Sequence, residues 1–233
     1  EFSAQWSRFV PHRGDGEDHG VRPWHSLFDF MQRSRIAFRT MTTPSAESEE
    51  SLRGPLARLF AGCERFEQLQ LPLATVALDL VGGEMVVFQD GSLIDGLYAS
   101  SAIPGVFPPL ERDGAVIVDG GGPYRVPVEA CRDLGADFVV AVDIPGYQEA
   151  NLRSGFALGM RSNAIARDRL NEYVCAGADM VIRPDVGHVH WADFNAAAAV
   201  REAGREAARQ ALPELRRRWR RRQSPLVQLV SAD

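Results

Sequence analysis

Residues 99–122 read ASSAIPGVFPPLERDGAVIVDGGG, and the interpretation of the whole sequence depends on this stretch. It begins with small residues and prolines and later contains a short apolar run, residues 115–118. The run is rich in β-branched residues and predicts a β-strand, and the glycines that follow favour a turn. Asp119 is therefore expected where the strand ends. A carboxylate at this position either takes part in catalysis or is simply the first residue of a turn. The stretch alone does not decide between the two.

Strand and helix patterns alternate on both sides of this stretch. Residues 73–80 and 84–88 flank a glycine-containing turn and predict a hairpin. Residues 137–143 form a nearly continuous apolar run, typical of a strand buried on both faces, and residues 179–182 predict another short strand. Helices are predicted at residues 24–41, 51–63, 91–101, 126–134, 153–176 and 191–222. Pro213 is a candidate break in the last of them. This order predicts an α/β fold with a largely parallel sheet.

The composition is that of a soluble globular protein. Of the 233 residues, 45% are hydrophobic and 24% are charged, and no apolar run approaches the length that crosses a membrane. The three cysteines lie far apart, so we expect reduced thiols and a cytoplasmic protein rather than a disulfide framework. All 26 basic residues are arginines, which excludes lysine chemistry such as Schiff-base formation by this sequence.

The histidines do not form a recognisable metal-binding pattern. His12, His19 and His25 lie near acidic residues, but their spacing fits neither a helical pair of ligands nor a calcium-binding loop. His188 and His190 lack a carboxylate or cysteine at matching spacing, so we interpret them as loop histidines. We predict no metal site and no cofactor.

Residues 71–145 resemble the patatin-like phospholipase family in the order of their motifs. The segment ASSAIPGVFPP is similar to the family's Ala-Ser-x-Ala-Ile-Pro-Gly-x-Phe-Pro-Pro segment. It precedes Asp-Gly-Gly, a Pro-Val turn and the sequence Leu-Gly-Ala-Asp. The likeness extends over residues 51–212 and implies a three-layer α/β sandwich with a mostly parallel central sheet. Residues 25–222 would then be one partial patatin-like domain, between a polar segment, residues 1–24, and a tail, residues 223–233.

The resemblance implies a serine acyl hydrolase of lipid esters, of the phospholipase A or lysophospholipase type. In that family a serine in a Gly-x-Ser-x-Gly elbow attacks the ester, with the aspartate of the Asp-Gly-Gly motif as its only partner. A glycine-rich loop forms the oxyanion hole. By position the aspartate is Asp119, followed by the motif glycines Gly120 and Gly121, which allow close backbone approach and unusual φ angles. The implied wall of the active site consists of Ser101, Ala102, Ile103, Pro104 and Gly105.

The nucleophile of the family pattern is absent from this sequence. None of the fourteen serines has a glycine two positions before it, and the glycine-rich loop and first apolar strand are missing too. Ser100 and Ser101 do not lie on a strand-to-helix elbow, and Ser154 is interpreted as a helix-start residue. Tyr124 stands where the family usually has asparagine. We expect the serine on a missing N-terminal segment or a second chain; the alternative is a variant that has lost its chemistry.

Six arginines and a tryptophan end the last predicted helix: Arg216, Arg217, Arg218, Trp219, Arg220, Arg221 and Arg222. One interpretation is a solvated helix end, whose positive charge suits the helix dipole. Another is peripheral contact with a membrane, with arginines facing phosphates and Trp219 at the interface. Nucleic-acid binding is disfavoured by the net charge of −5.

These observations predict a hydrolase of a lipid or fatty-acyl ester, cytoplasmic and in peripheral contact with a membrane. Because the sequence lacks the elbow, the 233-residue chain is expected to be inactive alone. The alternative is a non-catalytic patatin-like module that binds lipid or regulates a partner.

Overall fold

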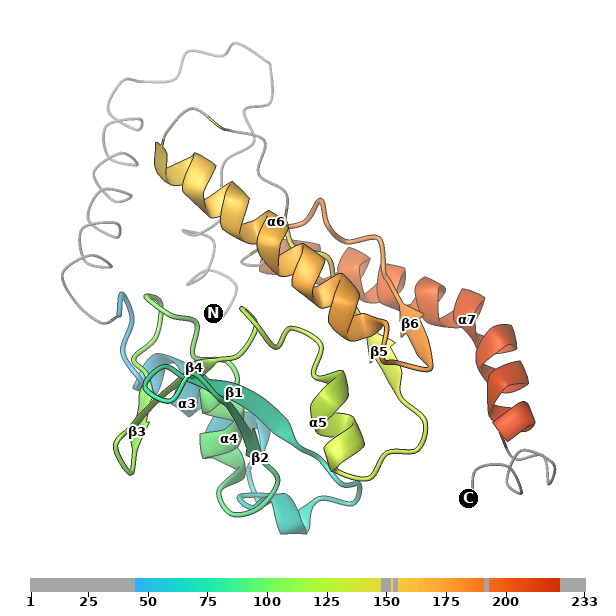
Figure 1. Ribbon diagram of the computed structural model, residues 1–233. Helices are drawn as coiled ribbons and strands as arrows, with labels where there is room; N and C mark the ends of the chain where they lie inside the picture. The colour runs from blue at the N-terminus through green and yellow to red at the C-terminus, as the bar shows by residue number, and fades with distance from the viewer. Residues whose placement is uncertain (1–44, 148–151, 153–154, 191–192, 223–233) are drawn as a thin grey trace. The chain divides into compact units, whose positions relative to one another are not determined.

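The computed structural model describes residues 45–147, 152, 155–190 and 193–222 (Figure 1). The described chain forms two compact units, one ending at Arg125 and the other beginning at Val126. The helix predicted at residues 24–41, the polar N-terminal segment and the C-terminal tail lie outside the described residues.

The unit that ends at Arg125 contains one four-stranded sheet with the strand order β2-β1-β4-β3. Its strands are β1 (Thr75–Asp79), β2 (Met85–Phe88), β3 (Leu110–Arg112) and β4 (Ala115–Asp119). Its helices are α3 (Glu50–Leu59), the short 3₁₀ helix η2 (Phe66–Gln68) and α4 (Leu93–Ala99). Helix α4 packs on the sheet, and α3 packs on α4 (Figure 1).

All neighbouring strands of this sheet are antiparallel, so the prediction of a mostly parallel central sheet is wrong here. The pairs β1–β2 and β3–β4 are joined by tight turns, which connect only antiparallel neighbours. The central pair β1–β4 is antiparallel without such a turn. In the turn from β1 to β2, the Asp79 carboxylate accepts hydrogen bonds from the N–H groups of Val81 at 2.9 Å and Gly82 at 3.0 Å. The turn from β3 to β4 places Asp113 and Gly114 at positive φ, 52° and 83°.

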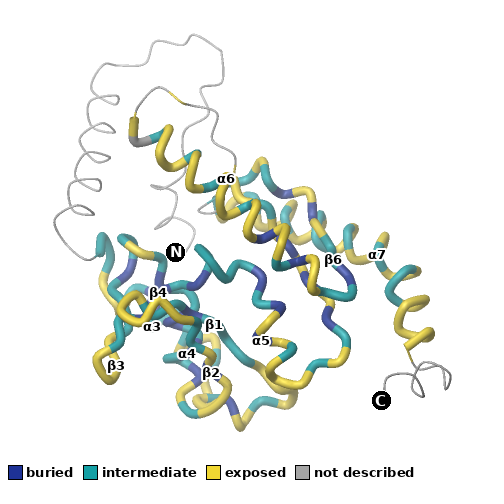
Figure 2. The backbone as a smooth tube through the Cα atoms, viewed as in Figure 1, coloured by how far each residue is buried: buried dark blue, intermediate teal, exposed yellow. Residues whose placement is uncertain are grey.

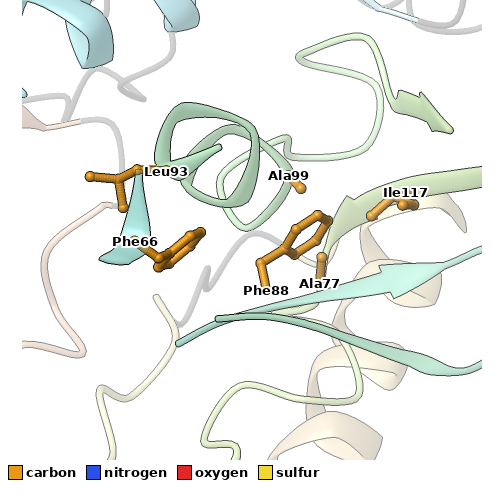
Figure 3. Close-up of a cluster of buried hydrophobic side chains, with 6 residues drawn as sticks. All are labelled: Phe66, Ala77, Phe88, Leu93, Ala99 and Ile117. Atoms are coloured by element: carbon orange, nitrogen blue, oxygen red, sulfur yellow. The ribbon is translucent and has the colours of Figure 1, made fainter. Parts of the chain in front are cut away.

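The core of this unit lies between the sheet and α4. It contains Phe66, Ala77, Phe88, Leu93, Ala99 and Ile117, all buried (Figure 3). Ala77 of β1 is the register partner of Asp119 of β4, and directly opposed residues of an antiparallel pair point to the same face. The Asp119 side chain therefore belongs to the sheet face that carries Ala77, at the edge of this core.

The unit that begins at Val126 contains a parallel pair of strands, β5 (Val140–Val142) and β6 (Met180–Ile182). Its helices are α5 (Val128–Asp133), α6 (Gly155–Cys175), the 3₁₀ helix η3 (Phe194–Ala196) and α7 (Ala197–Arg222). Helix α6 lies in the crossover from β5 to β6, which is what allows parallel pairing. Strand β5 is shorter than predicted, and Val140 and Val142 are exposed, contrary to the expectation of burial on both faces.

Helix α7 runs through Pro213 without the predicted break. Most of its side chains are exposed (Figure 2). None of the helices in the described residues combines the length and apolar character needed to cross a bilayer. The domain limits and the three-layer sandwich stay predictions.

Candidate active site

Asp119 is the last residue of β4, where the sequence predicts it. Its main-chain N–H donates a hydrogen bond to the carbonyl oxygen of Ala102 at 3.0 Å. Ala102 belongs to the segment implied as the active-site wall, and it is fully buried. The structure thus brings together the aspartate and the wall segment, which are seventeen residues apart in the sequence.

The Asp119 carboxylate lies in a partly buried position beside its own glycine turn. Its Oδ1 atom accepts a hydrogen bond from the Gly121 N–H at 2.6 Å. Burial raises the pKa of Asp119, and the hydrogen bond from Gly121 opposes that effect by lowering it. No side chain of the described residues donates a hydrogen bond to this carboxylate. The group is therefore a stronger base than an exposed aspartate, with Oδ2 free to receive a proton.

Both motif glycines have close neighbours, but of different kinds. A Cβ atom on Gly120 would lie 3.3 Å from the carbonyl carbon of Ala77 and 3.4 Å from its Cα, and backbone atoms of a central strand cannot move aside cheaply. A Cβ atom on Gly121 would lie 2.9 Å from Oδ1 of Asp119. Close backbone approach is thus found at Gly120, whereas the near atom at Gly121 belongs to a side chain. The prediction of unusual φ angles is wrong for this pair, because neither glycine has a positive φ.

The wall segment is a compact turn after α4. The Ile103 carbonyl accepts hydrogen bonds from the N–H groups of Val106 at 2.9 Å and Phe107 at 3.0 Å, which encloses Pro104 in the turn. Gly105 has a φ of 79°, a conformation that suits glycine, and its carbonyl accepts a hydrogen bond from Ala46 at 3.0 Å. Main-chain bonds therefore hold the segment on both sides.

Two residues that the sequence analysis missed support this wall. Tyr98 is fully buried in α4, and its hydroxyl donates a hydrogen bond to the Pro108 carbonyl at 2.7 Å. The Arg53 guanidinium lies 4.5 Å from the centre of the Tyr98 ring and pairs with Asp95 at 2.6 Å. A tyrosine just before the wall motif was the available signal, because a buried tyrosine hydroxyl usually has a hydrogen-bond partner.

No serine hydroxyl within the described ranges is bonded to the Asp119 carboxylate. Ser100 caps the C-terminus of α4, and Ser101 begins the wall. Neither hydroxyl forms a hydrogen bond with the Asp119 carboxylate in the described part of the chain, and Ser154 lies outside it. Tyr124, the departure from the family pattern, is accommodated through its main chain, since its N–H donates to the Gly120 carbonyl at 2.7 Å.

A comparison with family models matches residues 29–132 to the patatin-like phospholipase family, a range that contains both the wall and the Asp-Gly-Gly motif. The matched region belongs to this family. A patatin-like phospholipase domain-containing protein 6 of Homo sapiens is 30% identical over 172 residues, 68% of this chain and 12% of that protein. An uncharacterized NTE family protein of Mycobacterium tuberculosis is 38% identical over 96 residues, 41% of this chain and 27% of that protein. The matched region thus spans about a quarter of the mycobacterial relative and about an eighth of the human one.

The arginine-rich end of this patatin-like chain divides into two groups. Arg218 donates a hydrogen bond to the main-chain oxygen of Asp179, Arg222 lies 3.5 Å from the Asp137 carboxylate, and the rings of Trp219 and Phe138 meet edge to face at 5.5 Å. Arg217 and Arg218 both pair with Glu214. Arg216, Arg220 and Arg221 have no ion pair with any described residue.

The histidines of the described region have ordinary surface contacts. His188 lies 4.0 Å from the Asp185 carboxylate, and the His190 and Tyr147 rings meet edge to face at 5.1 Å. No three His, Cys, Asp or Glu side chains in the described ranges are grouped as metal ligands. His12, His19 and His25 lie outside those ranges.

Proposed function

We propose that this chain supplies the carboxylate of a Ser-Asp dyad in a lipid acyl hydrolase of the phospholipase A or lysophospholipase type. The observation that carries the proposal is the position of Asp119. It ends a core strand, is tied to the wall segment by its own N–H, and accepts a hydrogen bond at Oδ1 from Gly121 while Oδ2 accepts none from the described residues. Membership of the patatin-like phospholipase family supports lipid esters as the substrate class.

The chemistry requires a base rather than a second nucleophile. Asp119 would take the proton of a serine hydroxyl while the serine oxygen bonds to the ester carbonyl carbon. As the tetrahedral intermediate collapses, the departing alcohol takes that proton, and the acyl group stays on the serine. A water molecule then attacks the acyl-serine, again giving its proton to Asp119, and the fatty acid leaves with the serine hydroxyl restored. A partly buried carboxylate with a raised pKa suits this exchange.

The serine in this proposal comes from outside the 233-residue sequence. No serine of the sequence has the elbow pattern, and no described serine hydroxyl bonds to Asp119. An N-terminal segment or a second chain would supply it, together with the oxyanion loop. Cytoplasmic location is part of the proposal and is supported by the small number and wide spacing of the three cysteines in the sequence.

The test compares the 233-residue chain with the product of its gene extended upstream of the Glu1 codon, using a chromogenic short-chain ester. The proposal expects no turnover by the chain alone and turnover by the extended protein. Asp119→Asn should lower that turnover by about 10²- to 10⁴-fold, the usual contribution of a positioned base. Turnover that survives Asp119→Asn would refute the dyad.

A second candidate is a non-catalytic module that binds lipid. The absence of the Gly-x-Ser-x-Gly pattern from the sequence favours it. An upstream coding sequence that also lacks this pattern, together with vesicle binding and no ester turnover, would establish this alternative.

A further inference from the structure

The last two turns of α7 have an inner and an outer side. Trp219, Arg218 and Arg222 contact Phe138, Asp179 and Asp137 of the β5–β6 region, which defines the inner side. Residues four apart share one side of a helix. Arg216 and Arg220 therefore form one row and Arg217 and Arg221 the next, and both rows are turned away from the inner contacts. We call these four residues the outer arginine face.

The outer arginine face carries charge that the described residues leave largely uncompensated. All four side chains are exposed. Arg217 shares Glu214 with Arg218, whereas Arg216, Arg220 and Arg221 have no acidic partner among the described residues. The helix dipole favours positive charge only within the last turn, so it accounts for Arg220 and Arg221 but not for Arg216.

Upstream on the same helix, arginines are neutralised. Arg205 lies 2.8 Å from the Glu202 carboxylate, and Arg209 lies 3.2 Å from Glu202 and 3.5 Å from Glu206. These two arginines are also four residues apart. The helix therefore contains one compensated and one uncompensated pair of identical spacing, Arg205/Arg209 and Arg216/Arg220.

We propose that the outer arginine face binds the phosphates of an anionic lipid bilayer surface. Guanidinium groups form paired hydrogen bonds with phosphate oxygens, and four of them on one exposed side match a charged surface rather than a single ion. Trp219 is not part of this face: it lies on the inner side of the helix, where its ring meets Phe138 edge to face while 47% of the residue stays exposed. Contact through the outer arginine face is therefore electrostatic, and the role at the membrane interface expected of Trp219 from the sequence stays a separate prediction.

A bilayer fits this face better than a nucleic acid does. Proteins that hold single-stranded nucleic acids stack bases on aromatic rings, and the outer arginine face has no aromatic ring, because Trp219 lies on the inner side against Phe138. The choice of lipid also rests on the proposed lipid substrate. The binding itself requires no ester turnover, so the two proposals fail independently.

The test is co-sedimentation of the 233-residue chain with vesicles of phosphatidylcholine alone or mixed with phosphatidylserine. We expect binding to the mixed vesicles at low salt and loss of binding at high salt, because surface charges are screened. Arg216→Gln with Arg220→Gln should reduce the partition coefficient by about tenfold or more, given the usual contribution of each arginine near an anionic surface. Arg205→Gln with Arg209→Gln removes the same formal charge and should change it less than about twofold.

Three results would overturn the inference. Equal losses for the two double variants would show an effect of net charge alone. If the wild-type chain shows no salt-sensitive binding to the mixed vesicles, the outer arginine face is not a lipid-binding surface. Displacement from vesicles by a single-stranded oligonucleotide that binds more tightly would assign the face to nucleic acid. Unchanged circular dichroism of both variants ensures that a loss reports binding.

Discussion

The main-chain N–H of Asp119 donates a hydrogen bond to the Ala102 carbonyl at 3.0 Å, so the end of β4 and the segment after α4 position each other. The location of the carboxylate is thus fixed by backbone atoms on one side and by the Gly121 turn on the other. Substitutions that remove only the Asp119 charge should leave this geometry intact. Substitutions that add a side chain at Gly120, or that remove the Tyr98 hydrogen bond to the wall segment, should disturb this geometry.

Asp119→Asn should raise the stability of the chain at neutral pH. Burial raises the pKa of Asp119 above its ordinary value of 3.8, so the ionised form is disfavoured in the folded state. The contribution of this group is most favourable below 3.8 and is lost as pH rises through the folded-state pKa. The melting temperature of the variant should therefore exceed that of the wild type at pH 7, and the difference should vanish towards pH 3.8. Exposed Asp90→Asn is the control, and a constant difference across pH would contradict the argument.

Gly120→Ala should destabilise the chain by about 1–3 kcal/mol, the usual cost of forcing a methyl group into a packed site. The added Cβ would meet the Ala77 backbone of β1 at 3.3 Å. Gly122→Ala is a matched control in the same loop, because nothing lies within 4 Å of the Cβ it would carry. Urea denaturation of both variants measures the effect. Equal urea midpoints for the two variants would show that the β1 backbone can move to accommodate the added methyl group.

Tyr98→Phe should cost about 1–2 kcal/mol, because it removes a buried hydroxyl and leaves the Pro108 carbonyl without that donor. Since Pro108 follows the wall turn, amide exchange should also speed up at Phe107, whose N–H is bonded within that turn. Tyr173→Phe, on an 82% exposed tyrosine, should change neither quantity. If the variant is less stable but amide exchange at Phe107 is not faster, Tyr98 does not support the wall segment.

Asp79→Asn should lower the stability of the folded chain at pH 7. The variant should also lose less stability than the wild type as the pH falls. Hydrogen bonds from the N–H groups of Val81, Gly82 and Val116 lower the pKa of Asp79. A group with a lowered pKa stabilises the folded state above its ordinary value of 3.8, and that contribution is lost as pH falls through the folded-state pKa. The acid limb of a melting-temperature profile is the measurement. An unchanged acid limb would mean that the turn does not need the ionised carboxylate.

Local signals explain what the sequence could predict of the fold. The hairpin at residues 73–88 and the strand before Asp119 are confirmed, because glycine turns and β-branched runs act over a few residues. Strand β3 has only three residues and carries two charges, so no periodicity indicated it. The apolar run at residues 137–143 suggested parallel pairing, and its strand β5 does pair in parallel with β6. The prediction failed for the four-stranded sheet, in which two hairpins join antiparallel neighbours.

Of the candidate site, too, the sequence could predict the parts made of neighbouring residues but not the contacts between distant segments. Asp119 and its glycines follow one another in the sequence, so a motif could indicate them. The bond from Asp119 to Ala102 and the bond from Tyr98 to Pro108 join residues from different segments of the fold. Such pairings arise only when α4 packs on the sheet. For the same reason the sequence could not separate the inner from the outer arginines of α7, because the division depends on contacts with Phe138, Asp137 and Asp179.

Because the Gly121 N–H donates a hydrogen bond to the Asp119 carboxylate, protonation of that carboxylate changes the strength of a main-chain hydrogen bond. When the carboxylate is protonated it becomes a poorer acceptor, so the Gly121 amide is held less firmly. Each catalytic cycle of the proposed dyad would then briefly loosen and re-tighten this loop, in step with the arrival and departure of the proton. Faster hydrogen exchange at Gly121 than at neighbouring amides, appearing as pH falls through the Asp119 titration, is the expected signature, and uniform exchange along the loop would speak against it.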